Sequence, residues 1–202
     1  MQTIEPLEYG KFYHIYNHSV ANRDLFIEND NYQYFMKLYK KYIPVVADTF
    51  AWVLMKNHFH FLIRIKDVNE FEINQASHLT GFRNLSGMKL IPHQQFSNLF
   101  NAYSKAINKR YQFRGTLFER PFKRKCITSE NYLKKMVLYI HQNPVHHGFC
   151  QYVADYPWSS YLAFMSEKPT FLKSEKVLDW FDGDANFKFM HQKTINIEET
   201  DE

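Results

Sequence analysis

The stretch Met55–Ile65, with the sequence MKNHFHFLIRI, alternates as a β-strand does when its two faces differ in chemistry. One face carries His58 and His60 beside Leu62 and Arg64. The backbone positions of these two residues lie about 7 Å apart along such a strand. Neutral imidazoles at this spacing can bind one metal ion, although ordinary histidines on a half-exposed sheet face have the same spacing. The other face is uniformly apolar, which predicts packing against helices: Phe59, Phe61, Ile63 and Ile65.

The segments around this strand predict the order β-α-β-β-α-β, followed by one more helix. This order is typical of a ferredoxin-like α+β fold, an antiparallel sheet with helices on one face, here with a further C-terminal helix and an extended tail. Pro121 predicts that the last strand lies at an edge, and Ser129 is placed to cap the last helix, which should stop before Pro144. Strands are expected over residues 12–20, 45–55, 58–65 and 115–127, and helices over 30–43, 92–111 and 130–142.

Length and composition indicate one globular unit. The 202 residues predict a domain over 1–166 and a partly helical, acidic tail over 167–202. Apolar residues make up 45% of the chain and aromatic residues 18%, enough for a sizeable core. Two cysteines are too few for a disulfide framework. Neither a secretory signal nor a membrane-spanning stretch is present, so we expect a cytoplasmic protein without a membrane partner.

Charge is distributed unevenly along the chain. The net charge is +4, but residues 167–202 include nine acidic and five basic residues, so the first 166 residues carry a net +8. A positively charged body predicts an anionic partner, with nucleic acid as the first candidate, although a solvated surface can carry the same charge. Eight cations in one run are the candidate nucleic-acid contacts: Lys105, Lys109, Arg110, Arg114, Arg120, Lys123, Arg124 and Lys125.

The helix expected after Ser129 places two polar side chains at the border of its apolar face. Tyr139 and Asn143 are four residues apart, so they are neighbours on one side of the helix. A border position lies next to the sheet, where a phenol and an amide oxygen can stand beside the two histidines. Tyr132 lies on the same side two turns earlier and is the alternative nucleophile. The spacing alone also fits a packed tyrosine ring and an asparagine that starts a turn before proline.

Several motifs resemble one protein family. The stretch MKNHFHFLIRI resembles the histidine-hydrophobic-histidine (HUH) motif of single-strand DNA nucleases. The stretch YIHQNPVHHG at residues 139–148 resembles the catalytic-helix signature of REP-associated tyrosine transposases, relatives of the insertion-sequence-200-like transposases. The segments YHIYNHSVANRDLF, RGTLFERPFK and YPWSSY also look like that family, and the resemblance spans about residues 9–165 in the family's order.

This resemblance implies a metal site and a reaction. A divalent ion, Mg²⁺ or Mn²⁺, would be held by His58, His60 and Asn143, although many relatives carry glutamine at the third position and imidazole suits Zn²⁺ or Fe²⁺ better. Tyr139 would attack a phosphodiester of single-stranded DNA and form a 5′-phosphotyrosine beside a free 3′-hydroxyl. The expected substrate is a DNA hairpin with a short single-stranded flank, and the expected activity is DNA strand transfer.

Other functions share parts of this pattern. A hairpin-binding protein that has lost cleavage keeps the fold, and metal-dependent turnover distinguishes it. A replication initiator or relaxase of the same nuclease class is usually longer, and 202 residues leave no room for a helicase. An RNA-binding module of this fold should display aromatic side chains where this sheet displays histidines. The extended tail favours a monomer over a homodimer that exchanges catalytic helices.

Overall fold

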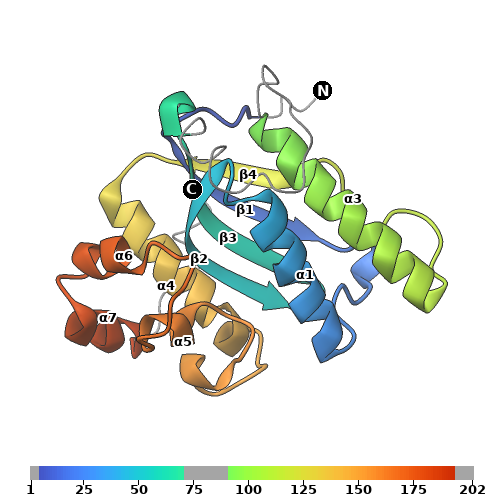
Figure 1. The fold of residues 1–202 in the computed structure, drawn as a ribbon. Helices are drawn as coiled ribbons and strands as arrows, with labels where there is room; N and C mark the ends of the chain where they lie inside the picture. The colour runs from blue at the N-terminus through green and yellow to red at the C-terminus, as the bar shows by residue number, and fades with distance from the viewer. Residues whose placement is uncertain (1–4, 71–90, 194–202) are drawn as a thin grey trace.

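Four strands form one antiparallel sheet in the order β2-β3-β1-β4 in the computed structural model of the chain (Figure 1). The structure describes residues 5–70 and 91–193. Strand β4 lies at one edge of the sheet, as predicted, while β1 and β3 lie in the middle. The strands are β1 (Phe12–His18), β2 (Ala47–Met55), β3 (His58–Ile65) and β4 (Lys123–Ile127).

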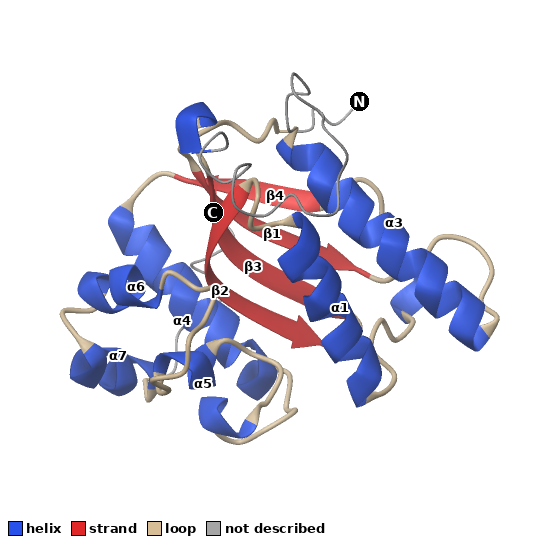
Figure 2. Ribbon diagram, viewed as in Figure 1, coloured by secondary structure: helices blue, strands red, loops and turns tan. Residues whose placement is uncertain are grey.

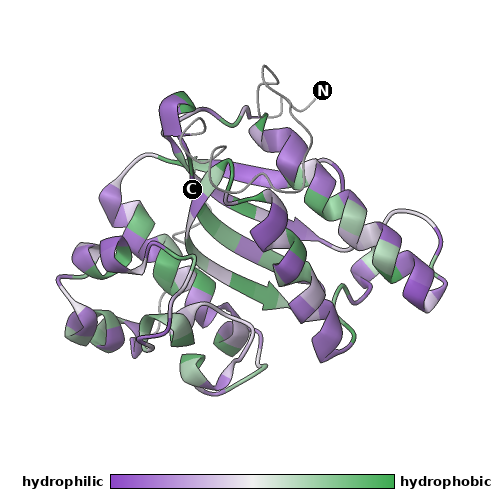
Figure 3. Cartoon of the chain, viewed as in Figure 1, coloured by the Kyte–Doolittle hydropathy of each residue, from purple (hydrophilic) through white to green (hydrophobic). Residues whose placement is uncertain are grey.

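Helices α1 (Asn29–Tyr42) and α3 (Pro92–Tyr111) cover one face of the sheet (Figure 1). They follow β1 and β3 along the chain, so the predicted β-α-β-β-α-β order and the ferredoxin-like α+β class are confirmed. The apolar face of β3 packs against them, with the Phe35 and Phe59 ring centroids 5.4 Å apart. Figure 3 shows the hydrophobic colour concentrated on β2 and β3, which lie between the helix layers.

A second group of helices covers the opposite face of the sheet (Figure 2). Helix α4 (Glu130–His146) packs across β2 and β3. A second core forms there, in which Trp180 stacks on Phe50 of β2 with ring centroids 5.2 Å apart. Helix α4 therefore lies against the face of β3 that carries His58 and His60. The helices around α4 are α5 (Tyr161–Phe164), α6 (Ser174–Trp180) and α7 (Asp184–His191).

The C-terminal part of the chain packs into this second core. Phe181 and Phe187 are at most 2% exposed and lie in the same cluster as the apolar residues of α4. The predicted division at residue 166 stays a prediction, and residues 194–202 of the expected tail lie outside the described residues. Across 5–70 and 91–193, no helix combines the length and apolar character that crossing a bilayer requires.

Strand β4 is shorter than the sequence predicted. A strand was expected over residues 115–127, but β4 begins at Lys123. In the segment before β4, Phe118 forms only an isolated β-bridge with Ser19, although Leu117 and Phe118 are both buried. Pro121 has no N–H to donate to a neighbouring strand. The segment before β4 therefore runs as an irregular loop.

Helix α4 continues past the proline at which it was expected to stop. The sequence predicted an end before Pro144, but the helix runs to His146. A proline cannot donate to the carbonyl four residues earlier, which costs about 3 kcal/mol in a helix interior. Here the turn is buried, with Asn143 only 1% exposed, and the His147 N–H donates to the Asn143 carbonyl at 3.0 Å. Tertiary packing therefore outweighs the local preference and keeps Asn143 on a helical turn.

Candidate active site

Five ring side chains of β1 and β3 gather on the face that α4 covers. The antiparallel register pairs His18 with His58 and Tyr16 with His60. The rings of these pairs stack, with centroids 4.8 Å apart for His18 and His58 and 5.8 Å apart for Tyr16 and His60. His14 completes the group by stacking on Tyr16 and His60, at 4.6 and 5.0 Å. Both histidines of the HUH-like motif therefore share this face, and β1 adds three rings to them.

Helix α4 brings Tyr139 and Asn143 to the two histidines of β3. The Tyr139 ring stands edge-on to the His60 ring, with centroids 5.4 Å apart and an interplanar angle of 85°. One turn later, Asn143 Oδ1 lies 3.1 Å from Nε2 of His58. The Ser129 hydroxyl caps the start of the helix, as the sequence predicted. The structure thus brings together the four residues that the sequence assigned to the metal site and the nucleophile.

The alternative nucleophile, Tyr132, lies two turns earlier on α4. Its ring centroid is 5.5 Å from Nζ of Lys125 on β4. Tyr139, in contrast, contacts two imidazoles, because its ring centroid also lies 5.9 Å from that of His14. The arrangement of the rings therefore favours Tyr139 over Tyr132 as the residue that works with the histidines.

Hydrogen bonds on the outer side of the two β3 rings determine which nitrogen remains for a ligand. Asn57 Oδ1 lies 2.7 Å from His58 Nδ1, and His14 Nε2 lies 2.8 Å from His60 Nδ1. An amide oxygen only accepts, so His58 Nδ1 donates and His58 Nε2 keeps a lone pair. That lone pair faces Asn143 Oδ1, which is also an acceptor. A cation near both atoms, or rotation of the Asn143 amide, removes this mismatch.

Burial keeps these imidazoles neutral near pH 7. It lowers the pKa of His58 to about 4 and the pKa of His14 to about 3, and it places the pKa of His60 well below its ordinary value. Loss of hydration is the largest cause in each case, and the charge of Lys125 lowers the pKa of His14 further. A neutral imidazole is the form that binds a metal ion.

The donor set at this site fits a divalent cation that keeps places open for substrate. Two imidazoles and one amide oxygen supply three protein ligands, which leaves coordination positions for phosphate or water oxygens. In the part of the chain that the structure covers, no group of three or more His, Cys, Asp or Glu side chains is arranged to hold a metal ion. The amide of Asn143 is thus the candidate third ligand, and the metal site stays a proposal.

Two of the eight candidate nucleic-acid contacts lie beside these rings. In the register of β1 and β4, Tyr16 pairs with Lys123 and His14 pairs with Lys125. Because paired residues share a face, both lysines point toward the α4 side of the sheet. Lys123 Nζ lies 5.9 Å from the Tyr16 ring centroid. The edge strand thus adds positive charge next to the histidines.

The other six candidates lie elsewhere, so the run in the sequence is not one surface. Arg110 at the end of α3 is paired with Glu28 and Asp30, at 2.8 and 3.4 Å, which neutralises its charge. Lys109 and Arg114 are exposed near the same end of α3. The remaining three line a groove between α3 and the segment before β4: Lys105, Arg120 and Arg124.

Sequence reasoning missed two residues that orient the motif, His14 and Asn57. His14, Tyr16 and His18 alternate along β1 as His58 and His60 do along β3, which is a signal that the sequence contained. To place these rings beside His58 and His60, one must know the register in which β1 pairs with β3. A helix separates the two strands in the chain, and one sequence does not specify that register. Asn57 lies in the tight turn between β2 and β3 and gave no signal of its own.

Comparison with known proteins supports the fold. No protein-family model matches the chain, and no curated protein matches it in sequence. Among solved structures, a REP-associated tyrosine transposase bound to a REP hairpin is similar, with a TM-score of 0.59 and 15% sequence identity. The match covers 84% of this chain and 88% of the other. At this identity the likeness is one of fold, and it agrees with the antiparallel α+β architecture described above.

Proposed function

We propose that this protein is a single-strand DNA endonuclease and strand transferase, a transposase that forms a 5′-phosphotyrosine on hairpin-forming DNA ends. The observation that carries the proposal is the meeting of α4 with β3. Residues 85 positions apart in the chain, His58 and Asn143, approach to 3.1 Å, and Tyr139 lies against His60. A phenol beside two neutral imidazoles and an amide oxygen has the parts that metal-assisted transfer of a phosphodiester requires.

Tyr139 supplies the nucleophile in this mechanism. Its Oη forms a bond to the phosphorus of a backbone phosphodiester while the bond from phosphorus to O3′ breaks. The phenol loses its proton, and the departing O3′ gains one. A phenol ionises more readily than a sugar hydroxyl, so it is both an accessible nucleophile and a good leaving group. The phosphotyrosine keeps the ester bond, so a new 3′-hydroxyl can displace it without ATP.

His58, His60 and Asn143 are the side chains that would hold Mg²⁺ or Mn²⁺. A bound divalent cation polarises the phosphate and helps to align it with the nucleophile. The chain's own contribution is to keep both rings neutral and fixed in direction. The Nδ1 contacts with Asn57 and His14 serve that purpose, because such outer hydrogen bonds orient ligand rings and select their tautomer.

Hairpin DNA is the proposed partner, for two reasons. Lys125 places a positive charge at the sheet edge beside the candidate site, and Lys123, which pairs with Glu119 at 3.5 Å, lies next to it; both can contact a DNA backbone. The solved transposase that shares this fold is bound to a REP hairpin. Positive charge near the reacting phosphate also stabilises charge that develops there during transfer.

A cleavage assay tests this function directly. A labelled hairpin oligonucleotide with unpaired flanks is incubated with Mn²⁺, and the products are separated on a denaturing gel. The wild type should form a covalent protein–DNA band. Tyr139→Phe should abolish this band and retain DNA binding, while the matched control Tyr132→Phe should keep it. Loss of the band in Tyr132→Phe alone would assign the nucleophile to Tyr132 instead.

One observation favours a second candidate, a hairpin-binding protein without cleavage. His58, His60 and Asn143 are each at most 4% exposed, so α4 lies close against the strand. A protein that only binds DNA needs no access to these atoms. Binding of the hairpin with no Mn²⁺-dependent product, over a range of flank sequences, would support this candidate and exclude the transferase.

A further inference from the structure

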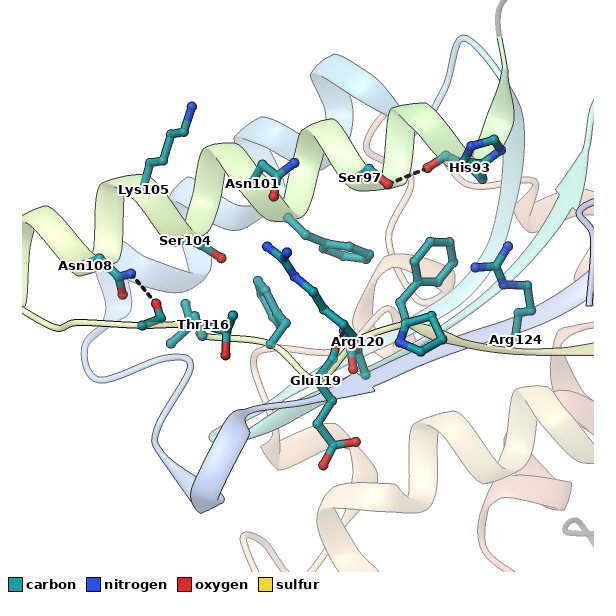
Figure 4. A pocket seen from close by; sticks show the side chains of 17 residues that line it. His93, Ser97, Asn101, Ser104, Lys105, Asn108, Thr116, Glu119, Arg120 and Arg124 are labelled. Carbon is teal, nitrogen blue, oxygen red and sulfur yellow. Dashed lines mark hydrogen bonds between the residues drawn. The ribbon is translucent and has the colours of Figure 1, made fainter. Parts of the chain in front are cut away.

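A groove runs between α3 and the segment before β4, on the side of the sheet opposite to the candidate active site (Figure 4). Its volume of about 670 Å³ lies within the usual range of ligand sites. Phe100 and Phe122 form part of its lining, and each is only 8% exposed. Their rings pack together with centroids 5.4 Å apart. Buried rings that pack on each other give the groove a fixed shape.

Positive charge is concentrated in this groove. Figure 4 shows Arg120 extending toward α3, Arg124 at one end, and Glu119 pointing away. Glu119 instead pairs with Lys123 at 3.5 Å. The Arg124 guanidinium lies 3.9 Å from the Phe122 ring centroid, and its buried Nε has no hydrogen-bond partner among the described residues. Arg124 lines the groove together with Arg120, and guanidinium groups bind phosphate oxygens through charge-assisted hydrogen bonds.

The α3 wall of the groove carries a stripe of polar side chains. Its members follow each other at intervals of three or four residues, while the apolar stripe of α3 faces the core. Figure 4 shows Asn101 and Ser104 on the side of the helix that faces Arg120. Amide and hydroxyl groups hydrogen-bond to base edges, sugars and phosphates. The stripe consists of His93, Ser97, Asn101, Ser104 and Asn108.

We propose that this groove binds the unpaired DNA strand that adjoins the hairpin. Phosphates contact Arg120 and Arg124, and bases or sugars lie along the polar stripe of α3. This inference rests on the proposed function, because it takes DNA as the substrate. A single strand fits the groove better than a duplex, since its bases are not paired and can reach the α3 wall. A duplex offers this groove mainly phosphates.

Edge strand β4 connects the groove to the candidate active site. Its side chains alternate, so Lys123 and Lys125 face the side of His14, while Arg124 faces the groove. Within the described ranges, β4 pairs with β1 on one side and with no strand on the other. A DNA backbone that crosses this edge meets a cation on each face. One continuous strand can therefore occupy the groove and lead toward Tyr139.

Binding measurements in EDTA test the groove without cleavage. The probes are a random-sequence single strand of about 20 nucleotides and a blunt-ended hairpin, both followed by fluorescence anisotropy. Arg120→Gln should weaken single-strand binding about tenfold, the effect of losing one charge-assisted hydrogen bond, and lower the slope of log K against log salt by about 0.7. Asn101→Asp, which adds negative charge to the wall, should weaken it as well. Both variants should bind the blunt hairpin as the wild type does.

Two variants provide matched controls. Asn98→Asp makes the same change on α3 outside the groove, and Lys37→Gln removes a charge from α1. Both should bind the single strand like the wild type. Arg120 and Asn101 are exposed, so their variants should melt at the wild-type temperature.

Three results overturn the proposal. The first is failure of the wild type to bind the single strand, and the second is unchanged affinity in both groove variants. The third is an equal loss for the blunt hairpin, which assigns the groove to the duplex stem. The covalent-band assay separates this inference from the proposed function. Groove-dependent binding without a covalent band refutes only the transferase, and a covalent band with normal binding by the groove variants refutes only the groove.

Discussion

Replacing His191 with phenylalanine should flatten the dependence of stability on pH. His191 of α7 belongs to a chain of hydrogen bonds that runs through His141 of α4 to Ser160, whose Oγ accepts from the Trp52 N–H of β2 at 2.9 Å. His191 Nδ1 donates to the Phe187 carbonyl at 2.7 Å, so its Nε2 accepts from His141 Nδ1 at 2.8 Å. His141 Nε2 then accepts from the Ser160 hydroxyl at 2.7 Å. Both rings are neutral in this arrangement, and each polar hydrogen has an acceptor.

The size of the effect follows from the pKa of His191. Burial lowers this pKa to about 4, compared with about 6.5 in the unfolded chain. Because the folded state has the lower pKa, the unfolded state binds more protons as the pH falls from 6.5 toward 4, and stability is lost over that range. The two values give a loss of about 2 kcal/mol at pH 5, with little loss at pH 7. Phenylalanine does not titrate, so the variant should lack this loss.

Urea unfolding at pH 7 and pH 5 measures the difference. His191→Phe removes hydrogen bonds and should lower the free energy of unfolding by about 1–3 kcal/mol at both pH values. The quantity to compare is therefore the difference in the free energy of unfolding between pH 7 and pH 5 within each protein. The free energy of unfolding of the wild type should fall about 2 kcal/mol further than that of the variant. His93→Gln on the exposed side of α3 should behave like the wild type. An equal fall in wild type and His191→Phe would refute the assignment of this pH dependence to the buried ring.

Two further predictions concern the candidate active site. His14→Phe keeps a ring but removes the hydrogen-bond partner of His60 Nδ1. Calorimetry should therefore show Mn²⁺ binding about 10–100-fold weaker, with partial recovery in His14→Gln. Unchanged Mn²⁺ affinity in His14→Phe would contradict the orienting role. Lys125→Gln should slow formation of the covalent band by about a hundredfold in a single-turnover gel assay, since it removes positive charge beside the site. Lys135→Gln on the exposed side of α4 is its control, and an equal effect of both variants would argue against a local role for Lys125.

The β3 stretch was the most informative part of the sequence, because the alternation of its side chains assigns residues to both faces of the sheet. Four apolar residues at alternate positions predicted a face that packs against helices, and the structure confirms that Phe59 and Phe61 pack in the core under α1 and α3. The same alternation placed His58 and His60 on the opposite face. Helical spacing was equally direct for Tyr139 and Asn143, since residues four apart share a side of any helix.

The wrong predictions share one cause, which is tertiary packing that local rules do not contain. Pro144 disfavours helix locally, yet a buried turn carries α4 past it. Leu117 and Phe118 look like strand residues and are buried, yet Phe118 forms only an isolated bridge with Ser19, and regular pairing begins at Lys123. The basic run shows the same limit, because the sequence alone does not say which of its members share a face, and β4 sends Lys125 and Arg124 to opposite sides of the sheet. The positions of these residues depend on register and on partners distant in the chain.

Contacts on both sides of one turn of α4 connect the C-terminal helices to the candidate active site. Tyr139 and Asn143 face the β3 histidines, while His141 and Gln142 face α7, where the Gln142 side-chain amide donates to the His191 carbonyl at 3.2 Å. The turn is therefore held between the sheet and α7. A shift of α4 by about 1 Å would take Asn143 out of contact range of His58, and a displacement of that size can lower the rate of an enzyme about a hundredfold. The segment that the sequence treated as an appended tail thus helps to set the position of Tyr139, the proposed nucleophile, relative to the two imidazoles.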